Sequence, residues 1–274
     1  MGAACLTAAP AAAAPARAVG RPGCLRAQVD DPARCALVWM HGLGDTEEKW
    51  AQTIRTQVLP LLEETAGPCK LVTPLAPRGP ISAHEGRWTT RWFDMEKLPL
   101  AAGNNPPELG CSLEDAEVSV ERIHGIIDEL VRQGIPADKI AVGGFSQGGA
   151  IAMLAALQYP QRLACCINLS GLLLGSDRLH RLIHPANKEL DTIWFHGEYD
   201  RVLLPSMQRV GCVALEQAGV PVTRKRFPCS HKAHPRAIQE AADILLVRFT
   251  AESAKAFVVM PEALPSLLTK KLEK

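Results

Sequence analysis

With 274 residues, 47% of them hydrophobic, the chain can bury a substantial core and suits one large domain. Its 30 Lys and Arg residues nearly balance its 29 Asp and Glu residues, and a formal net charge of +1 does not favour nucleic acid as a partner. No apolar run approaches the roughly 20 residues that a membrane-spanning helix requires.

The two ends of the chain differ in composition from its middle. Residues 1–28 are mostly Ala, Pro, Gly and Arg without the apolar block of a secretory signal, so we predict a disordered tail there. We place one folded domain at residues 29–250 and a C-terminal extension at residues 251–274, where the apolar pattern decays. Cys5 in the tail is a candidate for lipidation, although Leu6 stands where a myristoylation signal has Ser or Thr.

The nine cysteines indicate the cellular compartment. They include no Cys-x-x-Cys pair of the kind found in zinc sites, and several fall in predicted strands. We interpret them as reduced core residues of a cytoplasmic protein, with membrane association through a lipidated Cys5. We expect neither a metal nor an organic cofactor.

Short apolar or β-branched runs alternate with longer segments of helical period through the middle of the chain. This alternation predicts an α/β fold with a mainly parallel central sheet and helices on both faces. The apolar character of the runs favours strands that are covered on both faces. The predicted strands are residues 35–40, 70–73, 139–143, 165–169, 191–196 and 222–227.

The clearest predicted helix begins after Ser112 and ends at about Gln133, with Ser112 and Asp115 forming a capping-box-like start. Further helices are expected at residues 147–158, 206–218 and 235–248. Residues 78–110 are rich in Pro, Gly, Asn and aromatic residues. Because this stretch is too long for a plain connector, it is typical of a lid or a binding loop.

The sequence Gly-Phe-Ser-Gln-Gly at residues 144–148 follows a predicted strand and precedes a predicted helix, which is the context that a G-x-S-x-G nucleophile turn requires. The turn is so tight that Gly144 and Gly148 must lack bulk. The hydroxyl of Ser146 is then expected to project into a cleft at the positive end of the helix. Chance produces this pentapeptide in glycine-rich turns, but the flanking elements favour a nucleophile.

A serine hydroxyl attacks an acyl carbon only when a base removes its proton, and a histidine oriented by a carboxylate does this near neutral pH. In α/β-hydrolases the acid and then the histidine follow the serine along the chain. Asp200 lies in the loop after the predicted strand 191–196 and is our preferred acid. The alternatives are Asp191, at the wrong end of that strand, and Glu198, which we expect to point to solvent. His196 is interpreted as a structural loop residue.

Two histidines follow the last predicted strand and compete for the role of base. His231 lies within the loop, whereas His234 directly precedes Pro235 and has the position of a helix cap. We take His231 as the base and keep His234 as the alternative. His41 follows the first predicted strand, which is the wrong place for the base.

The glycines of the sequence His-Gly-Leu-Gly-Asp at residues 41–45 let the backbone curl after the first strand, so that an amide can point into the cleft. The oxyanion that forms on attack needs two such donors. We assign them to the backbone amides of Leu43 and of Gln147, the residue after the serine.

Together these motifs resemble the acyl-protein thioesterase, or lysophospholipase/carboxylesterase, family of α/β-hydrolases. The matching segments are residues 41–45, 92–94, 134–136 and 143–150 and the His-Gly-x-x-Asp of residues 196–200. The resemblance implies a single α/β-hydrolase domain with Ser146, Asp200 and His231 as the catalytic triad. The chain departs from the family at Cys229-Ser230, where many members carry a glycine, and in the expanded segments 67–70 and 101–110.

Apolar residues near the predicted site suit a fatty acyl chain, and Trp92, Leu98 and Leu172 are the candidate substrate-binding residues. Trp92 could equally be a structural residue behind the oxyanion turn. The leading hypothesis is hydrolysis of S-acyl, palmitoyl-type thioesters on proteins through an acyl-enzyme on Ser146, with peripheral membrane contact. The alternative is a general carboxylesterase or lysophospholipase that acts on small esters or lysolipids. A catalytically dead acyl-binding protein would have lost a triad residue, and none is lost here.

Overall fold

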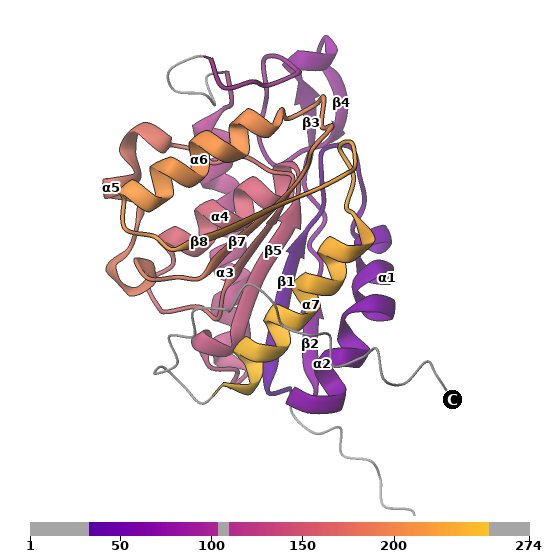
Figure 1. The fold of residues 1–274 in the computed structure, drawn as a ribbon, viewed down its shortest axis with the longest axis vertical. Helices are drawn as coiled ribbons and strands as arrows, with labels where there is room; N and C mark the ends of the chain where they lie inside the picture. Colours follow the sequence, from indigo (N-terminus) through magenta and orange to yellow (C-terminus); the bar gives the residue numbers. More distant parts are fainter. Residues whose placement is uncertain (1–32, 104–109, 252–274) are drawn as a thin grey trace, which may run out of the picture. The chain divides into compact units, whose positions relative to one another are not determined.

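The structure is a computed structural model that describes residues 33–103 and 110–251. A six-stranded parallel sheet forms the centre of these residues. Each strand lies within two residues of a predicted one at either end, and every neighbouring pair is parallel (Figure 1). The spatial order is β2 (Cys69–Val72), β1 (Cys35–Met40), β5 (Ile140–Phe145), β6 (Cys166–Leu169), β7 (Thr192–Gly197) and β8 (Val222–Phe227).

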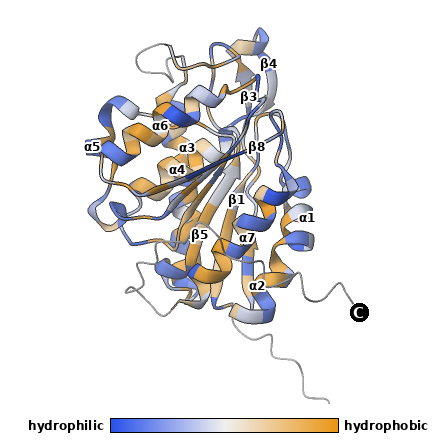
Figure 2. Ribbon diagram, viewed as in Figure 1, coloured by the Kyte–Doolittle hydropathy of each residue, from blue (hydrophilic) through white to orange (hydrophobic). Residues whose placement is uncertain are grey.

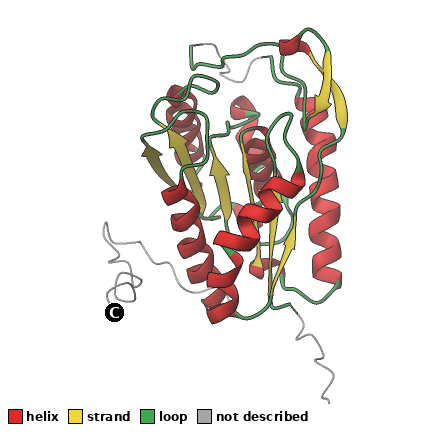
Figure 3. Ribbon diagram, turned by 90° about the vertical axis from the view of Figure 1, so that its right-hand side faces the viewer, coloured by secondary structure: helices red, strands yellow, loops and turns green. Residues whose placement is uncertain are grey.

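Helices cover both faces of this sheet (Figure 3). The apolar side chains of β1 alternate between two core clusters, with Val38 in one and Leu37 in the other, because successive residues of a strand point to opposite faces. One face packs against α1 (Glu47–Gln57), α2 (Leu59–Ala66) and α7 (Pro235–Thr250); the other packs against α3 (Leu113–Arg132), α4 (Gln147–Gln158), α5 (Leu179–Leu182) and α6 (Pro205–Gln217). The predicted architecture is confirmed.

Two of the predicted helices bear directly on the site. Helix α3 begins as its sequence indicates, since Ser112 Oγ accepts a hydrogen bond from the Asp115 amide at 3.2 Å. In α4 nearly every residue is buried, because small and apolar side chains surround the whole helix (Figure 2). The first turn of α4, which follows Ser146, is therefore packed on every side by the protein core.

The prediction that all six strands are covered on both faces is wrong for β8. Residues 223–226 of this strand, Thr-Arg-Lys-Arg, are exposed, and the strand is hydrophilic in Figure 2. Among the described strands, β8 pairs with β7 alone and forms one edge of the sheet. Charged side chains on such an edge strand oppose pairing with another chain, so the polar sequence fits an edge rather than a covered strand.

The long stretch 78–110 contains structure that the sequence did not predict. β3 (Arg78–Ile81) and β4 (Arg87–Thr90) form an antiparallel hairpin, joined by the short 3-10 helix Ser82–His84. The hairpin supports the turn after β1, because the Gly44 amide donates to the Thr90 carbonyl at 2.9 Å. The remainder of the stretch, residues 91–103, runs past the carboxyl ends of the strands toward the loop after β7, where the Leu100 amide donates to the Val202 carbonyl.

The predicted tail 1–28, with its candidate lipidation site Cys5, lies outside the described residues, and so does the extension 251–274 apart from its first residue. The domain boundaries therefore stay predictions. Within the described ranges no helix is long and apolar enough to cross a membrane, and no group of three His, Cys, Asp or Glu side chains could hold a metal ion. Cys165 is a free core thiol whose pKa burial raises to about 12.

Candidate active site

Ser146 occupies the turn between β5 and α4 in a strained backbone conformation. Its φ of 56° and ψ of −120° lie in a region that residues other than glycine rarely adopt. A Cβ on Gly144 would lie 2.5 Å from the Gly148 carbonyl, and a Cβ on Gly148 would overlap the carbonyl oxygens of Met40 and His41. The turn therefore needs both glycines because it packs directly against the end of β1.

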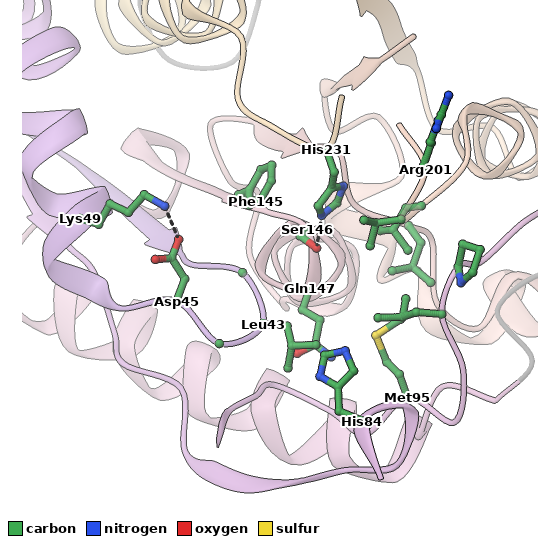
Figure 4. A pocket seen from close by; sticks show the side chains of 17 residues that line it. Leu43, Asp45, Lys49, His84, Met95, Phe145, Ser146, Gln147, Arg201 and His231 are labelled. Carbon is green, nitrogen blue, oxygen red and sulfur yellow. Dashed lines mark hydrogen bonds and ion pairs between the residues drawn. The ribbon is translucent and has the colours of Figure 1, made fainter. Parts of the chain in front are cut away.

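The structure brings Ser146, His231 and Asp200 together in one hydrogen-bonded chain, of which Figure 4 shows the contact between Ser146 and His231. His231 Nε2 lies 2.9 Å from Ser146 Oγ, and His231 Nδ1 lies 2.7 Å from Asp200 Oδ2. The three residues follow β5, β7 and β8, whose carboxyl ends meet at the same edge of the parallel sheet. Asp200 is 3% exposed, so water does not compete for its contact with the imidazole.

Backbone amides set the orientation of the Asp200 carboxylate. Its Oδ1 accepts hydrogen bonds from the amides of Val202 at 2.9 Å and Leu203 at 3.0 Å. The other oxygen, Oδ2, is left to face His231. A carboxylate held in this way accepts the Nδ1 hydrogen of the ring and leaves Nε2 free to accept a proton from a serine hydroxyl.

The alternative acids and the alternative base lie away from Ser146 Oγ. Glu198 is exposed, and Asp191 pairs with Arg248 at 2.7 Å at the opposite end of β7. His234 caps α7, since its Nδ1 accepts from the Arg236 amide at 3.2 Å, and its ring stacks on another aromatic ring with centroids 5.0 Å apart. Asp191 and His234 therefore have structural partners of their own, and Glu198 lies at the surface.

The predicted oxyanion donors belong to the same pocket as Ser146. Leu43 and Gln147 both line it. Gln147 is the first residue of α4, so its backbone amide has no acceptor within the helix. The Gln147 side chain has a role that the sequence did not reveal: Oε1 accepts from the Trp92 amide at 3.0 Å and Nε2 donates to the Phe93 carbonyl at 2.9 Å.

Trp92 does not line the pocket, so the prediction that it binds substrate is wrong, and the structure fits the alternative of a structural residue behind the oxyanion turn. Its side chain is 1% exposed and is absent from the lining of the pocket. The indole Nε1 donates to the His41 carbonyl at 2.7 Å, which ties the tryptophan to the back of the oxyanion turn. His41 itself accepts from the Ala76 amide at 3.0 Å, and burial lowers the pKa of its ring. Both residues therefore support the turn from inside the core.

A cavity of about 690 Å³ opens beside Ser146. Its size is within the range of about 300–1,000 Å³ that is usual for small-molecule sites. Leu98 and Leu172 line it as predicted, together with the apolar residues Met95, Pro99 and Leu203. Three basic side chains that the sequence did not single out, Lys49, His84 and Arg201, also border it (Figure 4).

A serine, a histidine and a buried carboxylate joined on the turns of a parallel α/β sheet define a serine hydrolase of the α/β-hydrolase fold. The chain belongs to the phospholipase/carboxylesterase family, whose model matches residues 27–247. The family resemblance, the fold class and the hydrolase activity inferred from the sequence are thereby confirmed.

Individual relatives agree with this assignment. A probable carboxylesterase from Oryza sativa subsp. japonica is 32% identical over 202 residues, covering 74% of this chain and 70% of the relative. Acyl-protein thioesterase 1 from Gibberella zeae is 30% identical over 214 residues, covering 76% and 88%. The crystal structure of SOBER1 from Arabidopsis thaliana superposes with a TM-score of 0.72 at 26% identity, covering 79% of this chain and 99% of that one.

Proposed function

We propose that this enzyme hydrolyses the thioester bond of S-acylated proteins that carry palmitoyl-type chains. The observation that supports this substrate best is the apolar wall beside the nucleophile, formed by Met95, Leu98, Pro99, Leu172 and Leu203. Each methylene of an acyl chain that leaves water for such a wall contributes about 0.8 kcal/mol. A long chain therefore gains far more from this cavity than a short one.

In the proposed acylation step, Ser146 Oγ attacks the thioester carbonyl carbon while His231 Nε2 takes the hydroxyl proton. Asp200 keeps the Nδ1 hydrogen directed at itself and stabilises the imidazolium that forms. The carbonyl oxygen becomes an oxyanion that accepts hydrogen bonds from the amides of Leu43 and Gln147. When the intermediate collapses, the carbon–sulfur bond breaks and the cysteine thiol leaves with the proton from His231.

Deacylation repeats these steps with water as the nucleophile in place of Ser146. His231 takes a proton from the water as its oxygen attacks the acyl carbon, and the same two amides hold the second oxyanion. The bond to Ser146 Oγ then breaks, the serine regains a proton from His231, and the fatty acid leaves. Every group in the cycle is supplied by the chain itself or by water.

Peripheral membrane contact and a cytoplasmic location are part of this proposal. Trp88 on β4 is 64% exposed. The exposed Arg78 lies on β3, on the same face of the hairpin as Trp88. An indole beside a guanidinium suits the boundary between lipid and water. Flotation with anionic vesicles, compared between the wild type and Trp88→Ala, tests the contact; equal recovery of both proteins would reject this face.

Lipidation of Cys5 stays a separate proposal, to be checked by mass spectrometry of the protein from cells.

Turnover of three substrates tests the proposed substrate class: an S-palmitoylated peptide, a short p-nitrophenyl ester and lysophosphatidylcholine. The proposal expects the highest kcat/KM on the palmitoylated peptide and loss of all three activities in Ser146→Ala. Activity on short esters alone would reject the palmitoyl substrate. Preference for lysophosphatidylcholine would establish the lysophospholipase alternative.

A further inference from the structure

A second, buried histidine contacts the acid of the triad. His196 is the penultimate residue of β7, and it is 2% exposed. Its Nε2 lies 2.8 Å from the Leu203 carbonyl oxygen and 3.4 Å from Asp200 Oδ2. Since His231 Nδ1 approaches the same Oδ2 at 2.7 Å, two imidazole nitrogens lie within 3.4 Å of this one carboxylate oxygen.

These contacts fix where His196 carries its hydrogen. A carbonyl oxygen only accepts, so Nε2 must be the donor. Nδ1 is buried and has no hydrogen-bond partner among the described residues, so no acceptor there stabilises a second proton on the ring. Burial is the main cause that lowers the pKa of the ring. A neutral His196 leaves the negative charge of Asp200 available to His231.

The charged and titratable neighbours of His196 come from three elements. Asp200 lies in the loop that follows the histidine itself, His231 lies in the loop after β8, and Arg226 lies on β8. Cys229, Lys232 and His234 share a small cavity with it. Asp200 is the acidic group among these neighbours, and its hydrogen-bonded partner is His231.

We infer that His196 is a positioning residue of the triad, which holds the acid loop to β7 through its Nε2 hydrogen. Leu203 links the two side chains: His196 donates to the Leu203 carbonyl, and the Leu203 amide donates to Asp200 Oδ1. We call these two hydrogen bonds the Leu203 path. The carboxylate therefore cannot turn away from His231 without breaking the hydrogen bond from the Leu203 amide. The inference rests on the proposed roles of Asp200 and His231.

Two substitutions separate the hydrogen bond from the bulk of the ring. His196→Leu fills the space without a donor, whereas His196→Gln places an amide N–H near the position of Nε2. His124→Leu is the matched control, because His124 on α3 also contacts a backbone carbonyl through Nε2, that of Ala155 on α4 at 2.9 Å, and takes no part in the triad. The readouts are kcat per folded molecule, KM, and the midpoint of the acidic limb of kcat/KM against pH.

We expect His196→Leu to lower kcat by about tenfold or more, which is part of the 10²–10⁴-fold that a general base contributes, with KM little changed. The acidic midpoint should move to lower pH, because an aligned carboxylate favours the protonated imidazole and its loss favours the neutral one. His196→Gln should restore most of kcat and the midpoint, and His124→Leu should change neither.

An unchanged midpoint in His196→Leu would overturn the positioning role, whatever the change in kcat per folded molecule. An equal change in His124→Leu would overturn it as well. The failure of the proposed function has a different signature, namely turnover that survives in Ser146→Ala. With Ser146→Ala inactive and His196→Leu normal, only the positioning role is rejected.

Discussion

The nucleophile turn and the apolar wall border the same cavity, yet they are built in different ways. At the turn, a Cβ on Gly148 would overlap the carbonyl oxygens of Met40 and His41, so no side chain fits there. The wall residue Leu98 is half-buried, and its segment is held by backbone hydrogen bonds between Leu100 and residues 202 and 204, both at 2.9 Å. Chemistry thus depends on positions where nothing can change, and substrate fit depends on side chains that can change without moving the turn.

The largest effect is expected from a methyl group added at the turn. Gly148→Ala forces the carbonyls of Met40 and His41 apart from α4 and should lower the free energy of unfolding by about 1–3 kcal/mol, with loss of most activity. Gly125→Ala is the control, because Gly125 lies exposed in the middle of α3 with no atom within 4 Å of the added Cβ. This change should stabilise the helix by about 0.5–1 kcal/mol.

Denaturant unfolding and turnover of both variants measure the difference. If Gly148→Ala were as stable and as active as Gly125→Ala, the close packing described for the turn would be wrong.

A smaller effect is expected at the wall, and it should depend on the substrate. Leu98→Ala removes apolar surface from the cavity and should raise KM for a palmitoyl thioester by about 5–30-fold, the equivalent of roughly 1–2 kcal/mol of lost burial. KM for an acetyl ester should stay within about twofold, since a short chain does not gain from burial along the wall. Val213→Ala, at an exposed position of α6, serves as control for both substrates. An equal rise in KM for long and short chains would exclude Leu98 from the acyl site.

The smallest effect concerns stability against pH. Burial lowers the pKa of both His41 and His196 from 6.5, so the folded state resists protons that the unfolded chain accepts. Their contribution to stability is complete above about pH 6.5 and is lost as the pH falls toward their folded-state values, with a slope of at most ~1.4 kcal/mol per pH unit for each histidine. Urea unfolding between pH 7 and 5.5 should show this slope. It should be shallower in His41→Gln and in His196→Gln, and an unchanged slope in both would contradict the burial argument.

The sequence was informative where local rules determine structure. The order of strand, glycine turn and helix around Ser146 located the nucleophile turn, because that geometry depends on adjacent residues. The preference for His231 over His234 followed from the proline at position 235, which marks a helix start, and the structure has a cap there.

Where distant segments meet, the sequence was less informative. Trp92 has the character of any buried aromatic residue, and only its contact with the His41 carbonyl, 51 residues away, shows that it supports the turn. The hairpin of β3 and β4 was missed because each strand has four residues and one of them contains a proline. His196 was interpreted as a structural loop residue, but it lies within β7, and its contact with Asp200 depends on how the loop after that strand folds back.

The central claim is that His231, and not His234, activates Ser146. The most direct test is the rate at which a fluorophosphonate probe modifies Ser146 in His231→Ala and in His234→Ala, with intact mass spectrometry to locate the adduct. The account predicts labelling that is abolished in His231→Ala and retained in His234→Ala. Labelling that survives loss of His231 and disappears with His234 would contradict it.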